Sequence, residues 1–102
     1  MGAGQDRGRA VAPTMPYRIE WRPLARKAFL ALDKPVRERI GAAVDKLAND
    51  PRPSGAKALK GMQGVLRIRV ADDYRVLYTI DDDDLLVLIV QTGHRSKIYG
   101  GH

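Results

Sequence analysis

Six consecutive apolar residues, Leu85 to Val90, follow a run of four aspartates, Asp81 to Asp84. A stretch this short that is apolar on both faces is typical of a strand covered from both sides. The aspartates before it predict a turn, because four like charges repel one another and favour full hydration. We therefore expect residues 85–90 to form a central strand of a sheet.

Three other segments, residues 17–21, 66–70 and 74–80, alternate or nearly alternate between apolar and polar residues. This period of two is typical of strands with one buried face. The short segment Ala71-Asp72-Asp73 separates the last two and predicts a tight turn between neighbouring strands. Together with residues 85–90, the pattern indicates a mostly antiparallel sheet.

The region between the first and second strands has helical periodicity. Pro23 can occupy the first turn of a helix, where its missing N–H costs nothing. Asp33-Lys34-Pro35 then starts a second helix, which the turn residues 49–55 end. The apolar positions of the second helix recur every three or four residues: Val36, Ile40, Ala43, Val44 and Leu47. The prediction is an α+β fold of order β-α-α-β-β-β, with a two-helix hairpin packed on one face of the sheet.

Length and composition limit the organisation of the chain. A chain of 102 residues predicts one domain. We expect residues 1–14 to be a disordered leader, since they show no periodicity, and residues 15–102 to form the domain. Cysteine is absent and only two histidines are present, so we expect no metal site and no cofactor. The sequence has no apolar run long enough to cross a membrane and no signal peptide, which favours a cytoplasmic protein.

The formal net charge is +6, from 18 basic and 12 acidic residues, and the bases are unevenly spread. Four acids are confined to residues 81–84. Five bases lie between Lys57 and Arg75, against only two acids, Asp72 and Asp73. A concentrated basic surface favours a polyanionic partner such as a nucleic acid.

Strand alternation indicates where the bases lie. Leu66, Ile68 and Val70 share one face, so Arg67 and Arg69 share the opposite, open face. Arg75 on the next strand has the parity to join them, and Arg95 ends the neighbouring central strand. The four arginines are expected to converge on one concave side of the sheet. Arginine suits phosphate, because its planar guanidinium group binds two oxygens at once. For any single arginine, a solvated outer face is the simpler interpretation.

An ordered series of motifs resembles the RelE-type toxins of the RelE/ParE superfamily. The resemblance runs from about Tyr17 to Tyr99, and its motifs are Lys57-Ala58-Leu59-Lys60-Gly61-Met62, Leu66-Arg67-Ile68-Arg69-Val70, Tyr74-Arg75-Val76-Leu77-Tyr78, Gly93-His94-Arg95 and Ile98-Tyr99. It implies a ribosome-dependent mRNA endoribonuclease in which a ribose 2′-OH attacks the adjacent phosphate without a metal. The implied partners are a cognate antitoxin, the ribosome and mRNA, with no membrane and no small-molecule ligand.

The resemblance also implies a catalytic set: Arg67, Arg69, Arg75, Arg95 and Tyr99. Arg67 and Arg69 match two lysines of the family, and an arginine cannot readily act as a general base at neutral pH. We expect both to stabilise charge, which leaves Tyr99, His94 or a group outside the chain as the proton acceptor. Lys57 and Lys60 precede the first arginine strand in a loop and are expected to contact RNA phosphates.

Two alternatives remain open at this point. The first is a ParE-like inhibitor that binds DNA gyrase and has no nuclease activity, since both kinds of toxin share the fold. The second is a decayed toxin that only binds its antitoxin. The joint presence of the arginine set and Tyr99 favours the nuclease.

Overall fold

The computed structural model describes residues 16–99, apart from the side chain of Tyr99. The expected leader, residues 1–14, lies outside this range. The elements in chain order are β2 (Arg18–Trp21), α1 (Pro23–Leu30), α2 (Lys34–Leu47), β3 (Lys57–Ala58), β4 (Val65–Val70), β5 (Tyr74–Asp81), β6 (Leu86–His94) and α3 (Arg95–Tyr99). This order confirms β-α-α-β-β-β and adds two short elements, β3 and α3.

The five strands form one sheet in the order β2-β6-β5-β4-β3. Among the strand pairs of residues 16–99, only β2–β6 is parallel, so the expectation of a mostly antiparallel sheet is confirmed. The apolar run predicted to be a central strand lies in β6 except for Leu85, which belongs to the preceding turn, and β6 is interior, with β2 and β5 on either side. The middle position of the five belongs to β5, and β6 extends to His94, four residues beyond the apolar run.

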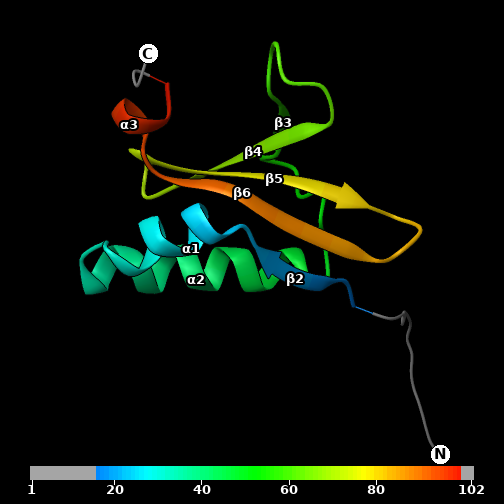
Figure 1. The fold of residues 1–102 in the computed structure, drawn as a ribbon, viewed down its shortest axis with the longest axis horizontal. Coiled ribbons are helices and arrows are strands. Elements are labelled where there is room, and N and C mark those ends of the chain that lie inside the picture. Colours follow the sequence, from blue (N-terminus) through cyan, green and yellow to red (C-terminus); the bar gives the residue numbers. More distant parts are fainter. Residues whose placement is uncertain (1–15, 100–102) are drawn as a thin grey trace, which may run out of the picture.

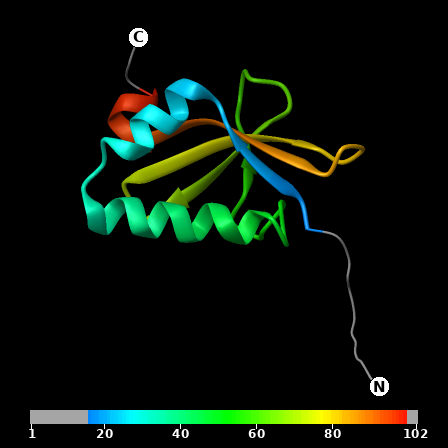
Figure 2. The ribbon, with the colours of Figure 1, turned by 60° about the horizontal axis from the view of Figure 1, so that its bottom comes forward.

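Both helices begin where the sequence predicts, with a proline in the first turn of each. In Figure 1, α1 and α2 lie together on one side of the sheet, and α3 lies on the other side, beyond the end of β6. Figure 2 shows α2 running along the length of the sheet, with the chain returning to β3 from its far end. The helical hairpin therefore covers one face, as expected.

The main core lies between this hairpin and the sheet. Fully buried side chains of α2 meet those of the strands, among them Ile40, Val44, Leu47, Val76, Tyr78, Val87 and Ile89. Tyr78 is buried in this core and donates a hydrogen bond from its hydroxyl to the carbonyl of Pro51 at 2.7 Å. Burial raises the pKa of Tyr78 to about 12. This hydrogen bond ties the loop after α2 to the middle strand of the sheet.

The acidic turn between β5 and β6 is also fixed to the rest of the fold. Arg52 binds both carboxylate oxygens of Asp82, at 2.8 and 3.2 Å, and the Tyr17 hydroxyl donates to the same carboxylate. These hydrogen bonds hold the pKa of Asp82 below its ordinary value. One aspartate of the four thus joins the start of β2, the loop after α2 and the β5–β6 turn.

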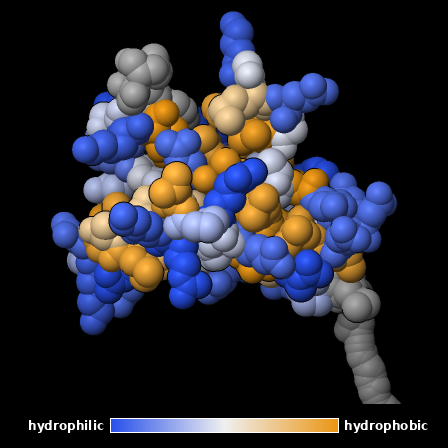
Figure 3. Space-filling model, viewed as in Figure 1, coloured by the Kyte–Doolittle hydropathy of each residue, from blue (hydrophilic) through white to orange (hydrophobic). Residues whose placement is uncertain are grey.

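The rest of the surface mixes polar and apolar side chains. On the face drawn in Figure 3, apolar patches alternate with hydrophilic ones. Leu24, Leu30 and Met62 are the exposed large apolar residues of the part described. No helix within residues 16–99 is long and apolar enough to span a membrane.

Candidate nucleic-acid interface

The strand register places most of the predicted cations on one face of the sheet. Lys57 of β3 lies directly opposite Arg67 of β4, and Arg69 of β4 lies directly opposite Arg75 of β5. Directly paired residues project from the same face, and alternation puts Arg67 and Arg69 together. We call this set, Lys57, Arg67, Arg69 and Arg75, the cationic ladder. It occupies the face opposite Ile68 and Val70, whose side chains are in the core.

Lys57 and Lys60 do not share one loop, which differs from the expectation. Lys57 belongs to the short edge strand β3, while Lys60 lies in the exposed turn that follows it. Backbone hydrogen bonds from Leu59 N to Val65 O, and from Val65 N to Met62 O, close this turn. Pairing of β3 with β4 aligns Lys57 with Arg67. A strand of only two residues has no alternation by which the sequence could predict it.

Arg75 has the predicted parity, but its side chain is not open to solvent. It is 6% exposed, and its Nη1 donates to the carbonyls of Asp72 at 2.6 Å and Tyr74 at 3.0 Å. Arg69 across the ladder is exposed. The expectation of a fully open face is therefore wrong at this position, because the guanidinium folds back onto the β4–β5 turn.

Leu77 adds to the covered part of this face. It is paired with Arg67 in register and is 1% exposed, yet it lies outside the main core cluster. The helix α3 contacts both β5 and β6. The face that carries the cationic ladder thus has a buried centre, with exposed cations toward β4 and β3.

Arg95 begins the helix α3 and does not end a strand, since β6 stops at His94. Its backbone N–H donates to the carbonyl of Asp73 at 2.7 Å, and its Nε pairs with the Asp73 carboxylate at 3.3 Å. Asp73 lies in the turn between β4 and β5, so the acid that pairs with Arg95 comes from outside the strands. Arg95 is thereby fixed beside the turn that also receives Arg75.

His94 was one possible proton acceptor, and its ring is engaged. Nδ1 accepts a hydrogen bond from the backbone N–H of Ser96 at 3.1 Å and lies 2.9 Å from the Ser96 hydroxyl. The ring also packs edge-on against Tyr74, with the centroids 5.3 Å apart. Since Nδ1 is an acceptor, the proton of the neutral ring is on Nε2. These contacts with the Ser96 backbone and the Tyr74 ring favour a structural role for His94.

Tyr99 is the last residue of α3, four positions after Arg95. Residues four apart in a helix lie on the same side, so the backbone brings Tyr99 to the side of Arg95. The residues described contain no group of three or more histidine, cysteine or acidic side chains that could hold a metal ion.

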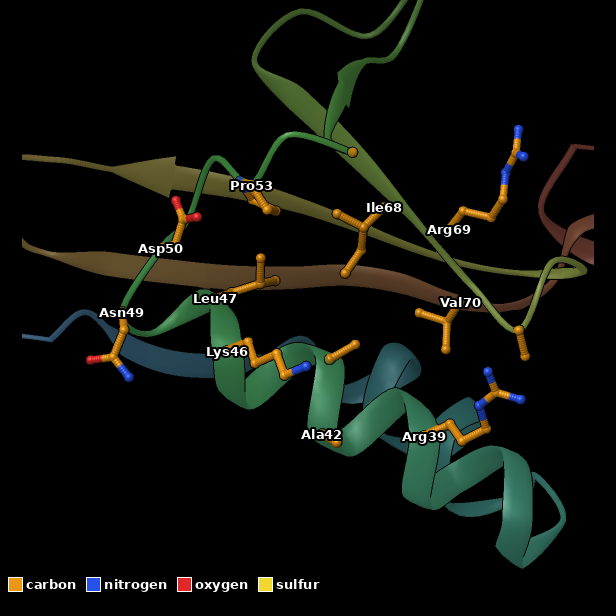
Figure 4. A pocket seen from close by; sticks show the side chains of 13 residues that line it. Arg39, Ala42, Lys46, Leu47, Asn49, Asp50, Pro53, Ile68, Arg69 and Val70 are labelled. Atoms are coloured by element: carbon orange, nitrogen blue, oxygen red, sulfur yellow. The ribbon is translucent and has the colours of Figure 1, made fainter.

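A groove of about 790 Å³ runs between α2 and β4, on the helical side of the sheet. No local pattern in the sequence indicates this groove. Ile68 and Val70 point down into the groove in Figure 4, while Leu47 rises toward them from the end of α2. Cations border it: Arg39 and Lys46 on α2 and Arg69 on β4, whose side chain turns away from the apolar floor. The groove is therefore apolar inside and mostly basic at its rim.

Comparison with known proteins decides the family. The family model of the ParE toxin of type II toxin–antitoxin systems matches residues 19–99. The chain belongs to the RelE/ParE superfamily of type II toxins. Toxin RelG of Mycobacterium tuberculosis is 32% identical to it over 90 residues, spanning 83% of this chain and 98% of the relative. The mRNA interferase RelE of Shigella flexneri is 27% identical over 88 residues, spanning 83% and 92%.

Solved structures agree with this assignment of a RelE-type toxin. A RelBE toxin–antitoxin complex from Mycobacterium tuberculosis matches with a TM-score of 0.69 and 27% identity, covering 78% of this chain and 99% of that one. The isolated RelE toxin of E. coli matches with a TM-score of 0.68 and 26% identity, covering 83% and 93%. The resemblance and the fold class drawn from the sequence are both confirmed.

Proposed function

We propose that this RelE-type toxin is an endoribonuclease that cuts mRNA on the ribosome, and that an antitoxin restrains it. The cationic ladder carries the proposal, because it sets exposed Lys57 and Arg69, with partly exposed Arg67, along one face beside Arg95. Spaced cations on one face suit a phosphate backbone. The relative named as an mRNA interferase supports RNA as the polyanion.

The proposed reaction is attack of a ribose 2′-OH on the adjacent phosphate, which expels the 5′-oxygen and leaves a 2′,3′-cyclic phosphate. Negative charge increases on the phosphate oxygens in the transition state, and fixed cations there lower the barrier. We assign this stabilisation to Arg67, Arg69 and Arg95, with Lys57 and Lys60 holding flanking phosphates. No metal is needed in this scheme.

Arg75 and Tyr99 complete the proposed catalytic set. Arg75 can reach a phosphate only after leaving the carbonyls of Asp72 and Tyr74, so its contribution requires a local rearrangement on the ribosome. Tyr99 would stack on a base or accept the proton, the latter only if neighbouring arginines lower its pKa from the ordinary value of about 10. A target on the ribosome implies a cytoplasmic protein.

The partner that fits the groove between α2 and β4 is an amphipathic segment of the antitoxin with acidic side chains at its edges. Its apolar face would cover Ile68 and Val70, and its acids would meet Arg39, Lys46 and Arg69. An amphipathic helix laid in an apolar groove is a common recognition mode. Because Arg69 belongs to both the rim and the cationic ladder, an antitoxin bound here would also mask part of the RNA face.

The test is to express the toxin in cells and map new 5′ ends on messages. Cuts that recur at a fixed position within translated codons, and that vanish when translation initiation is blocked, would support the ribosome-dependent nuclease. A gyrase inhibitor is the second candidate, because the matching family model is named for ParE. Intact messages together with DNA damage would favour it and overturn the proposal.

A further inference from the structure

The turn between β4 and β5, residues 71–73, contacts two arginines that come from different elements, Arg75 from β5 and Arg95 from α3. The buried Arg75 donates hydrogen bonds from Nη1 to the carbonyls of Asp72 and Tyr74. From α3, Arg95 donates its backbone N–H to the carbonyl of Asp73 and pairs its Nε with the carboxylate of the same residue. Three consecutive carbonyls, those of residues 72, 73 and 74, thus accept hydrogen bonds from arginines.

The backbone of this turn is strained, so its shape requires support. Ala71 and Asp72 have φ of 50° and 62°, the left-handed region that residues with a Cβ seldom adopt. Strain of this kind persists where surrounding contacts fix the conformation. The hydrogen bonds from Arg75 and Arg95 are such contacts, and they orient the Asp73 carboxylate toward α3.

The Asp73–Arg95 pair uses one edge of the guanidinium. The Asp73 carboxylate lies 3.3 Å from Nε of Arg95, and within residues 16–99 Arg95 forms its ion pair with this carboxylate. The terminal nitrogens Nη1 and Nη2 form the fork that grips a phosphate. Holding Nε therefore leaves that fork available and removes part of the side chain's rotational freedom.

From this geometry we propose that Asp73 is a positioning residue, which fixes the guanidinium of Arg95 so that its terminal nitrogens face the reacting phosphate. The inference rests on the proposed function in assigning Arg95 to the phosphate. Asp73 does not touch RNA in this scheme. Its carboxylate orders Arg95 before substrate arrives, and preorganised cations stabilise developing charge without reorganisation during the reaction.

Asp73 could instead inhibit the toxin by occupying Arg95, and the test distinguishes this inhibition from positioning. A carboxylate beside Arg95 could compete with phosphate as a latch. Positioning predicts that removing the charge of Asp73 lowers activity, whereas a latch predicts that it raises activity. The side chains of Arg95 and Asp73 are 57% and 58% exposed, so an incoming phosphate can reach the pair directly, without a prior opening step that a latch would require.

The experiment compares wild type, Asp73→Asn and the matched control Asp72→Asn in ribosome-dependent cleavage of a defined message. Asp72→Asn removes the same charge from the same turn, at a side chain with no ion pair in the described range, and asparagine tolerates its left-handed backbone. We expect Asp73→Asn to lower kcat about tenfold with little change in KM, less than the 10²–10³ typical of losing the donor itself. The control should stay within about twofold of wild type.

A double-variant cycle distinguishes positioning from a general loss of structure. On an Arg95→Ala background, Asp73→Asn should cause no further loss, because the residue acts through Arg95. An equal tenfold loss on that background would overturn the inference. So would an Asp73→Asn toxin that matches the Asp72→Asn control or exceeds wild type.

One measurement does not depend on cleavage. In ¹⁵N NMR of the full chain, the Nε–H of Arg95 should exchange with water about tenfold faster in Asp73→Asn than in either wild type or Asp72→Asn. If wild type cuts no message on ribosomes, the proposed function fails, and this measurement still decides whether Asp73 holds Arg95. Exchange that is unchanged in Asp73→Asn would overturn the inference by itself.

Discussion

Arg69 and Arg75 lie directly opposite each other across the β4–β5 ladder, yet Arg69 is exposed and Arg75 is buried. The difference comes from the turn that joins the two strands, since the carbonyls of Asp72 and Tyr74 bind the guanidinium of Arg75. Two arginines with the same parity on the same face therefore have different roles in the free toxin. Arg69 is available to a partner, while Arg75 supports the fold.

This contrast predicts unequal effects on stability. Arg75→Ala should lower the free energy of unfolding by about 1–3 kcal/mol, because it removes a buried side chain and leaves two part-buried carbonyl oxygens without this donor. Arg69→Ala, the matched control across the ladder, should change it by less than about 0.5 kcal/mol. Urea unfolding of the two variants measures both values. Equal stabilities would mean that the hydrogen bonds of Arg75 contribute little.

Arg95→Ala should abolish growth inhibition while leaving the fold and antitoxin binding largely intact. Losing one preorganised donor at developing charge costs about 10²–10³ in rate, whereas an exposed arginine contributes little to stability. Arg95→Lys keeps the charge but loses the fork, so it should retain partial activity only if charge dominates. Growth after induction at matched expression is the measurement. Full toxicity of Arg95→Ala would make gyrase binding the better hypothesis.

Cleavage by a reconstituted ribosome mixture should require no transition metal, since cations of the chain itself are proposed to stabilise the phosphate. A chelator should leave the rate unchanged once the magnesium that the ribosomes need is restored. The rate before and after this treatment is compared with the same message. Activity that returns only with an added transition metal would contradict the scheme.

Tyr78→Phe should destabilise the toxin by about 1–2 kcal/mol at pH 7, because the part-buried carbonyl of Pro51 loses its donor. The raised pKa, about 12, means that the fold favours the protonated hydroxyl. Its stabilising contribution is therefore complete below the ordinary pKa near 10 and is lost as pH rises toward 12. Urea unfolding should show that the difference in free energy of unfolding between wild type and Tyr78→Phe is smaller at pH 11 than at pH 7. A gap independent of pH would refute this assignment.

Asp82→Asn should reduce thermal stability at neutral pH by breaking the contacts with Arg52 and Tyr17. Because the pKa of Asp82 is lowered in the fold, its stabilising contribution is present above the ordinary value and is lost as pH falls through the folded value. The melting temperatures of wild type and Asp82→Asn should therefore become equal in strong acid. Thermal melts at pH 7 and in acid test this, with Asp83→Asn as control, since the Asp83 side chain has no ion pair in the described part of the chain.

The sequence by itself determined the order of the elements and the parity of the strands. Pro23 and Pro35 marked the helix starts, alternation placed Ile68 in the core and Arg67 and Arg69 opposite it, and the apolar run identified an interior strand. These features depend on neighbours in the chain, through the periods of 2 and 3.6 residues and the fixed φ of proline. The motif series was enough to identify the RelE-type toxins.

Only the tertiary structure decided which cations are covered and which acid meets them. Alternation gives the face of Arg75 but not its burial, because its guanidinium folds back onto the carbonyls of Asp72 and Tyr74. The pairing of Arg95 with Asp73 joins residues 22 positions apart, and the groove between α2 and β4 exists only once helix and strand are packed. Such contacts depend on how elements distant in the sequence pack against one another, and a local period in the sequence does not determine that packing.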